Sequence, residues 1–301
     1  MIVIKPTAIA DASFVSSTVP ETDYAAWSAA TTYAIGDRVI LGTGYHSVYE
    51  SLRATNLNHH PATDTSSPAY WARVGPTNRW AMFDTRNATI TSAAGSVSAV
   101  FTPGQIGAMF LSGLVGSTAT VQIKDGVAGA VVYSATVSLL TGDVFDWFSY
   151  FFANFDQKAQ VVLTDLPIYS SSYVTVTVTG SGTVEIGTLL VGKMFSEGSA
   201  QYGAEAGIVD YSRKEVDAFG VMTFVERAFS KRFSVSLAID KARTIPFISL
   251  LNSLRATPAV YITTSDDNYA YLAALGFYRS YRTVVSYPTQ NLISLEIEEL
   301  A

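Results

Sequence analysis

Short β-branched segments, separated by glycine, aspartate and serine turns, recur through the middle third of the chain. The segments with this pattern are 97–101, 119–123, 131–137, 159–163, 173–178 and 184–190. Val174, Val176 and Val178 alternate with threonines, so a strand here would have one apolar and one polar face. Strands of this length and spacing favour a mainly β fold, with a β-sandwich or jelly roll in the middle of the chain.

Charge density indicates where this β region begins and ends. Residues 87–195 contain 9 charged residues, whereas 1–86 contain 13 and 196–301 contain 22. We therefore predict four parts: an N-terminal arm (1–25), a small module (26–76), a β-sandwich domain (77–195) and an α+β domain (196–301). Pro6 and Pro20 break regular structure in the arm, which either extends to a neighbouring subunit or packs on its own chain.

The C-terminal part mixes strand and helix patterns. Segments 219–227 and 232–240 are predicted to pair as a hairpin, and strands are expected at 259–264, 278–287 and 292–298. Between them, 244–255 has helical apolar spacing, with Thr244 as the expected N-cap and Pro246 in the first turn. In the last strand Ile293, Leu295 and Ile297 should face the core.

The residue types present exclude several kinds of function. The chain has no cysteine and three histidines, and we predict neither a metal site nor a cofactor. A net charge of −6 without a basic stripe argues against nucleic acid as a partner. The uncharged stretch 87–123 is interrupted by Pro103 and several glycines, so no membrane span is predicted.

No catalytic motif is found either. Glu296 and Glu298 would share a strand face, but no aromatic cleft pattern surrounds them, and an acidic solvent face is the preferred interpretation. We therefore expect a protein that is not an enzyme. The densest aromatic run, at 146–152, is predicted to cap the sandwich core; the alternative is an apolar contact patch for a partner subunit.

The small module carries the clearest constellation of residues. Trp27 is followed by Tyr33, by Gly36, Asp37 and Val39, by Tyr45 and Tyr49, and finally by Pro61 and Trp71. A domain of about 50 residues cannot assemble a large aliphatic core, so a few large aromatic rings must supply its buried area. We assign six residues to the core of the module, and expect two of them, Gly36 and Asp37, to form a hairpin turn. The six are Tyr33, Gly36, Asp37, Val39, Tyr49 and Trp71.

This pattern resembles the small chitin-type carbohydrate-binding modules. The resemblance implies a three-stranded domain that stacks exposed aromatic rings on sugars. At the two positions of the family's stacking pair this chain has Arg53 and Ala54. Two interpretations stay open: a structural or docking module, or a glycan-binding module that uses Trp27, Tyr45, Arg53 and His59.

The next segment, T-N-R-W-A-M-F-D at 77–84, resembles a recurrent feature of tailed-bacteriophage virion proteins. That resemblance implies a structural protein of the phage tail, at the tail tip or baseplate or at a fibre attachment. Such a protein would be synthesised in the bacterial cytoplasm and incorporated into the virion. Its partners would be other copies of itself and other tail proteins. The alternative function is recognition of a host surface polysaccharide.

Overall fold

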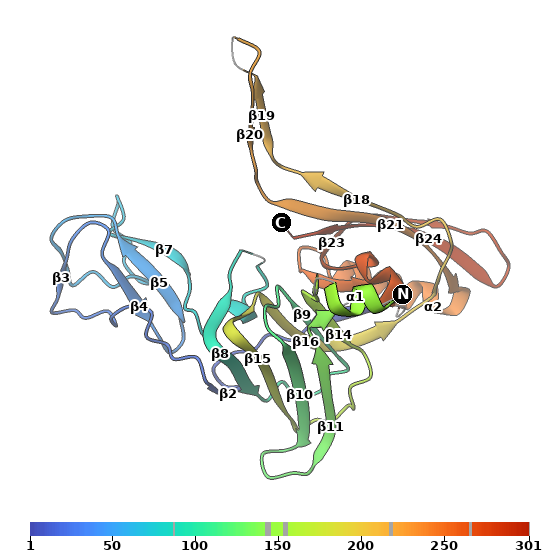
Figure 1. Cartoon of the computed structure of the whole chain (residues 1–301), viewed down its shortest axis with the longest axis horizontal. Helices are drawn as coiled ribbons and strands as arrows, with labels where there is room; N and C mark the ends of the chain where they lie inside the picture. Colours follow the sequence, from blue (N-terminus) through green and yellow to red (C-terminus); the bar gives the residue numbers. More distant parts are fainter. Residues whose placement is uncertain (87, 142–145, 153–155, 217–218, 265–266, 301) are drawn as a thin grey trace. The chain divides into compact units, whose positions relative to one another are not determined.

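The computed structural model describes all residues except 87, 142–145, 153–155, 217–218, 265–266 and 301. The chain divides into two compact units: Met1–Pro6 with Gly192–Ala301 form unit 1, and Thr7–Val191 form unit 2. Strands dominate both units, which confirms the predicted mainly β class (Figure 1). None of the helices described is long and apolar enough to span a membrane.

Unit 2 contains the predicted β-sandwich. One sheet has the order β11-β10-β15-β8-β2, with bounds Val131–Ser138, Thr118–Asp125, Ser172–Ile186, Thr91–Phe101 and Phe14–Ser17. The facing strands have the order β14-β9-β16, with bounds Gln160–Leu163, Ala108–Ser112 and Thr188–Ser196, and β16 leaves the unit at Gly192. β9 was not among the predicted strands, and the segment predicted at 184–190 is divided between β15 and β16.

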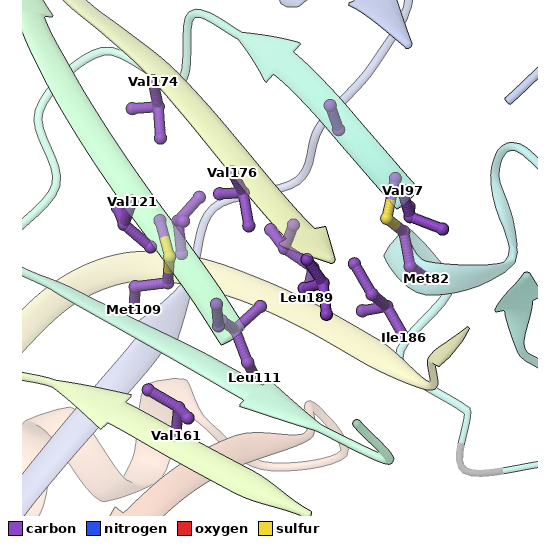
Figure 2. Close-up of a cluster of buried hydrophobic side chains, with 14 of the residues drawn as sticks. Met82, Val97, Met109, Leu111, Val121, Val161, Val174, Val176, Ile186 and Leu189 are labelled. Atoms are coloured by element: carbon purple, nitrogen blue, oxygen red, sulfur yellow. The ribbon is translucent and has the colours of Figure 1, made fainter. Parts of the chain in front are cut away.

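Buried side chains of the two layers meet in one core. Val121 and Val176 come from one layer and Met109 and Leu111 from the other, and all four are fully buried (Figure 2). Met82 also reaches this core, from the short 3-10 helix η1 (Ala81–Phe83). Along β15 the valines of segment 173–178 are buried and the threonines are only partly so, as the alternation predicts.

The aromatic run differs from the prediction. Residues Trp147–Phe152 form a short helix, α1, near the two-residue strands β12 (Leu140–Thr141) and β13 (Asp156–Gln157). Its aromatic side chains point into solvent with exposed fractions between 64 and 78%. The preferred interpretation, a cap on the sandwich core, is therefore wrong. The sandwich core is filled mainly by aliphatic side chains, together with Phe101, and the rings of α1 are not part of it.

The small module also lies in unit 2. β4 (Arg38–Leu41), β5 (Ser47–Ser51) and β7 (Trp71–Pro76) form a three-stranded antiparallel sheet. β3 (Thr32–Tyr33) and β6 (Asn56–Leu57) form a separate short pair. Its connections carry three histidines and several aromatic side chains, which are described below.

Unit 1 is an antiparallel sheet with a helix on it. Its order is β16-β1-β22-β23-β24-β21-β17. The bounds are Ile2–Pro6 for β1, Ala259–Ile262 for β22, Ala273–Val284 for β23, Gln290–Glu299 for β24, Phe229–Asp240 for β21 and Ser199–Ala200 for β17. Helix α2 (Lys241–Ser253) packs Phe247, Leu250 and Leu251 into the core of this unit, and the 3-10 helix η2 (Asp267–Leu272) precedes β23. Ile293, Leu295 and Ile297 face the same core, as predicted.

Both halves of the predicted N-terminal arm pack on this chain. β1 lies between β16 and β22, with Val3 and Ile4 buried, and β2 pairs with β8 in the other unit. Of the two interpretations of the arm, packing on its own chain therefore describes these strands. Helix α2 begins at Lys241, so its N-cap is Asp240 rather than Thr244, and Pro246 lies inside the helix rather than in its first turn.

The predicted hairpin between 219–227 and 232–240 is wrong. β20 (Met222–Val225) pairs with β19 (Arg213–Val216), whereas β21 pairs with β24 and with β18 (Glu205–Asp210). β19 and β20 continue beyond the sheet as a two-stranded ribbon, which projects from the rest of unit 1 (Figure 1). Every residue of these two strands is exposed. We call this pair the β19–β20 ribbon.

Candidate functional site

The core of the small module holds its surface side chains in place. Tyr33, Val39, Tyr49 and Trp71 are buried together. The rings of Tyr33 and Trp71 meet edge to face with centroids 5.1 Å apart, and Trp71 Nε1 donates a hydrogen bond to the His59 carbonyl at 2.8 Å. The loop that carries His59 and His60 is thus attached directly to the core.

Gly36 and Asp37, which we grouped with this core, lie elsewhere. Both are exposed and form the turn before β4, not a turn between two paired strands. Gly36 has a φ of 86°, a conformation that glycine adopts without strain. The Asp37 carboxylate accepts the backbone N–H of Ala34 at 2.7 Å, which closes the turn.

Two of the predicted glycan-binding side chains meet through a histidine. Trp27 is half-buried, and its ring meets the His60 ring edge to face at a centroid distance of 4.8 Å. Tyr45 is 46% exposed and lies 6.0 Å from the same His60 ring. Trp27 Nε1 is buried without a hydrogen-bond partner. Together these rings form a strip of aromatic surface, which we call the Trp27 strip.

The other two predicted side chains meet around Tyr70. The His59 ring stacks on the Tyr70 ring with centroids 3.4 Å apart and planes at 11°. The Arg53 guanidinium carbon lies 4.6 Å from the centroid of the same ring, within cation–π distance. His59 Nδ1 is 3.6 Å from an Asp64 carboxylate oxygen. Among these side chains, no ring contact joins the Tyr70 stack to the Trp27 strip.

Sequence reasoning missed a third cluster, centred on His46. Nδ1 of His46 lies 2.8 Å from Glu21 Oε1, and Nε2 is hydrogen-bonded to the Asp11 carboxylate. Both ring nitrogens of His46 therefore face a carboxylate oxygen. The hydrogen bond from His46 holds the pKa of Asp11 below its usual value. His46 therefore connects the module to the N-terminal segment at two points.

Glu21 extends this cluster toward the sandwich. Its Oε1 accepts a hydrogen bond from Thr77 Oγ1 at 2.8 Å, and its Oε2 lies 3.7 Å from Arg79 Nη1. Trp80 follows in the chain and lies flat beneath the His46 ring. Thr77, Arg79 and Trp80 belong to the segment 77–84, but the sequence does not reveal their contact with His46, which is 25 residues from Glu21 and 35 residues from Asp11.

A pocket of about 420 Å³ opens beside this cluster. It is lined by residues 9–12, by Tyr45 and His46, and by Trp80 and Phe83. Its volume is in the range of small-molecule pockets, and its walls combine aromatic and charged groups. Within the described part of the chain, no three histidine, aspartate or glutamate side chains are placed to hold a metal ion.

The carboxylates considered for acid–base chemistry lie on a sheet face. Glu296 forms an ion pair with Arg232, and Glu298 with Arg279 at 2.9 Å. All four side chains are on strands of unit 1, and these two arginines are 39 and 46% exposed. The pairs are cross-strand contacts of a solvated surface.

No family model matches this chain, and no curated protein matches its sequence.

Proposed function

We propose that this chain is a structural protein of a bacteriophage tail, at the tail tip or baseplate or at a fibre attachment. It acts by binding other copies of itself and other tail proteins, and it is not an enzyme. It is synthesised in the bacterial cytoplasm and incorporated into the virion. The resemblance of segment 27–84 to phage virion proteins suggests a place in the phage tail, and the exposed surface of the molecule supports a role in binding.

The observation that carries this proposal is the exposure of α1. Five aromatic side chains, those of Trp147, Phe148, Tyr150, Phe151 and Phe152, are at least 64% exposed on one short helix. Isolated surface aromatics are ordinary, but a contiguous group of this kind is typical of protein–protein contact sites. We call these five side chains the α1 patch.

Mass spectrometry and electron microscopy of purified phage particles test the proposal. We expect peptides of this chain in the particles, and we expect antibody-conjugated gold against it to label the tail and not the capsid. Empty capsids from a tail-assembly mutant are the control and should lack the protein. Absence of the chain from complete particles would contradict the proposed function.

A second function, recognition of a host polysaccharide, is favoured by the Trp27 strip. An aromatic surface that carries Trp27 and Tyr45 can stack on the apolar face of a sugar ring. Arg53 and His59, which both contact the Tyr70 ring, would supply hydrogen-bond donors.

An array of bacterial surface glycans tests this second function. We expect Trp27→Ala, and separately Arg53→Ala, to weaken binding that the unmodified chain shows. Ile35→Ala is the matched control, because Ile35 is an exposed apolar residue of the same module outside both ring clusters. Failure of the unmodified chain to bind any glycan at millimolar sugar would remove this alternative.

A further inference from the structure

The two faces of the β19–β20 ribbon have different chemistry. Lys214 pairs with Phe224, and Val216 pairs with Met222. Since side chains two residues apart share a face of a strand, these four lie on one side of the ribbon. The opposite face carries Thr223 and Val225 together with Arg213 and Glu215, whose side chains form an ion pair.

The apolar face is not covered by the residues of this chain that the structure describes. Val216, Met222 and Phe224 have exposed fractions of 60, 55 and 63%. A two-stranded hairpin is only marginally stable in water unless a third strand or another surface covers one face. A ribbon with one apolar face therefore has the composition of a surface that becomes buried on assembly.

The α1 patch has complementary properties. Between Lys124 and Lys158 the sequence contains four aspartates and no basic residue, and Asp146 directly precedes the helix. The ribbon face carries Lys214, and an ammonium group is attracted both to carboxylates and to the faces of aromatic rings. Of the two surfaces, one thus offers a cation among apolar groups, and the other offers aromatic rings next to the carboxylate of Asp146.

The size of the patch also matches a stable contact. Aromatic side chains bury roughly 150–250 Å² each, so five rings with about two thirds of their surface exposed offer roughly 500–900 Å². A standard interface buries about 800 Å² on each partner. The patch can therefore provide most of one side of a specific interface.

We propose that the apolar face of the β19–β20 ribbon of one copy docks on the α1 patch of a second copy of this chain. This inference deepens the proposed function, because it rests on the chain acting by subunit binding and names the two surfaces. The contact joins different surfaces of two identical chains. Repeated, such a contact closes into a ring or continues as an open array.

Two substitutions on neighbouring residues of β20 test the ribbon face. Phe224→Asp places a carboxylate on the apolar face, whereas Thr223→Asp places it on the polar face. By light scattering after size-exclusion chromatography, we expect the unmodified chain to self-associate, and we expect F224D to weaken association by roughly tenfold or more. T223D should associate like the unmodified chain. A monomeric unmodified chain, or equal effects of the two variants, would overturn the proposal.

Engineered disulfides test the partner surface without relying on either of these variants. Because the chain has no cysteine, each introduced thiol is unique. Chains carrying Met222→Cys are mixed with chains carrying Phe151→Cys under mild oxidation, and we expect a covalent dimer that contains one of each. Thr223→Cys is the matched control, and chains that carry it should form little covalent dimer with the Phe151→Cys chains. Equal yields from both pairs would overturn the proposed face, and no dimer from M222C would overturn the docking.

These outcomes separate the inference from the proposed function. If the chain is found in phage tails but neither F224D nor the M222C pair behaves as expected, the tail role stands and the docking fails. If the M222C dimer forms but the chain is absent from particles, the docking stands and the tail role fails. Unchanged thermal unfolding of the variants confirms that each one is folded.

Discussion

The imidazole ring of His46 lies flat on the indole ring of Trp80, with ring centroids 4.0 Å apart and planes at 19°. His46 directly precedes β5 of the small module, and Trp80 directly precedes η1. Since His46 is also bonded to Asp11 and Glu21, one side chain joins the N-terminal segment, the module and the linker that follows. His46 thus links these three segments by hydrogen bonds as well as by ring packing.

Replacement of Asp11 should change how stability depends on pH. The folded-state pKa of Asp11 is below the usual value of 3.8, so its bond to His46 contributes fully while the pH is above 3.8. As the pH falls below 3.8, the unfolded chain takes up the proton first, and the contribution is lost once the pH passes the lowered folded-state pKa. We expect Asp11→Asn to destabilise the chain at neutral pH.

Urea unfolding at neutral and at strongly acidic pH measures this difference. The gap in unfolding free energy between the unmodified chain and Asp11→Asn should narrow toward zero at the acidic end. Asp37→Asn changes a carboxylate of the same module that bonds only a local backbone N–H, and it serves as the comparison. If the difference in unfolding free energy for Asp11→Asn is the same at neutral and acidic pH, the contribution of Asp11 to stability does not depend on its ionisation, contrary to this prediction.

Glu21 should stabilise the contact between the N-terminal segment, the small module and the segment 77–80. Its carboxylate binds His46 and Thr77 and lies near Arg79, and its side chain is only 12% exposed. Glu21→Ala leaves these groups without their acceptor, so we expect a loss of about 1–3 kcal/mol. The measurement is chemical unfolding, with limited proteolysis at 77–86 as a local readout. If Glu21→Ala resists proteolysis and unfolding as well as the unmodified chain does, Glu21 does not have this role.

Trp71 should be a structural residue of the module. It is 7% exposed, packs on Tyr33 and donates a hydrogen bond to His59. Trp71→Ala should therefore cost about 3–5 kcal/mol and unfold the module. Tyr45→Ala, at an exposed ring of the same module, should cost about 0.5 kcal/mol or less by the same denaturant measurement. Similar costs for the two substitutions would contradict this division.

Gly192 should tolerate no side chain. A Cβ at this position would lie 2.0 Å from the Lys5 carbonyl oxygen, where β16 pairs with β1. We expect Gly192→Ala to displace β1 and to lower stability by about 1–3 kcal/mol, measured as a shift in thermal unfolding. Gly207 lies in β18, where a Cβ meets nothing within 4 Å, so Gly207→Ala should have little effect. If Gly192→Ala leaves the thermal unfolding temperature unchanged, β1 can move away from β16 without loss of stability, contrary to this prediction.

Local alternation predicted the strands that face a core. The valines of segment 173–178 and the isoleucines of β24 are buried as expected, because burial of every second residue follows from the pleat of a single strand. The same reasoning failed for the segment 219–227. Its strand pattern is real, but the pattern does not specify that β20 pairs with β19 rather than with β21.

The candidate site was predictable only in part. The aromatic spacing at 27–71 indicated the module and its rings, including the buried Tyr33 and Trp71. Tyr70 and His60 were missed, although each is adjacent to a residue that was singled out. The His46 cluster was missed, because Asp11 and Glu21 come from a segment that carries no motif. Thr77, Arg79 and Trp80 lie in the segment 77–84 that was singled out, but its local pattern does not show that it meets His46.

By itself the sequence determined the mainly β class, the alternating faces and the aromatic core of the small module. Each of these follows from residues close together in the chain, whose side chains take fixed directions once a strand forms. The tertiary structure alone decided which strands pair, that the rings of α1 stay in solvent, and that His46 meets Trp80 and two carboxylates. Those outcomes depend on contacts between residues far apart in the sequence, and many arrangements satisfy the same local pattern equally well.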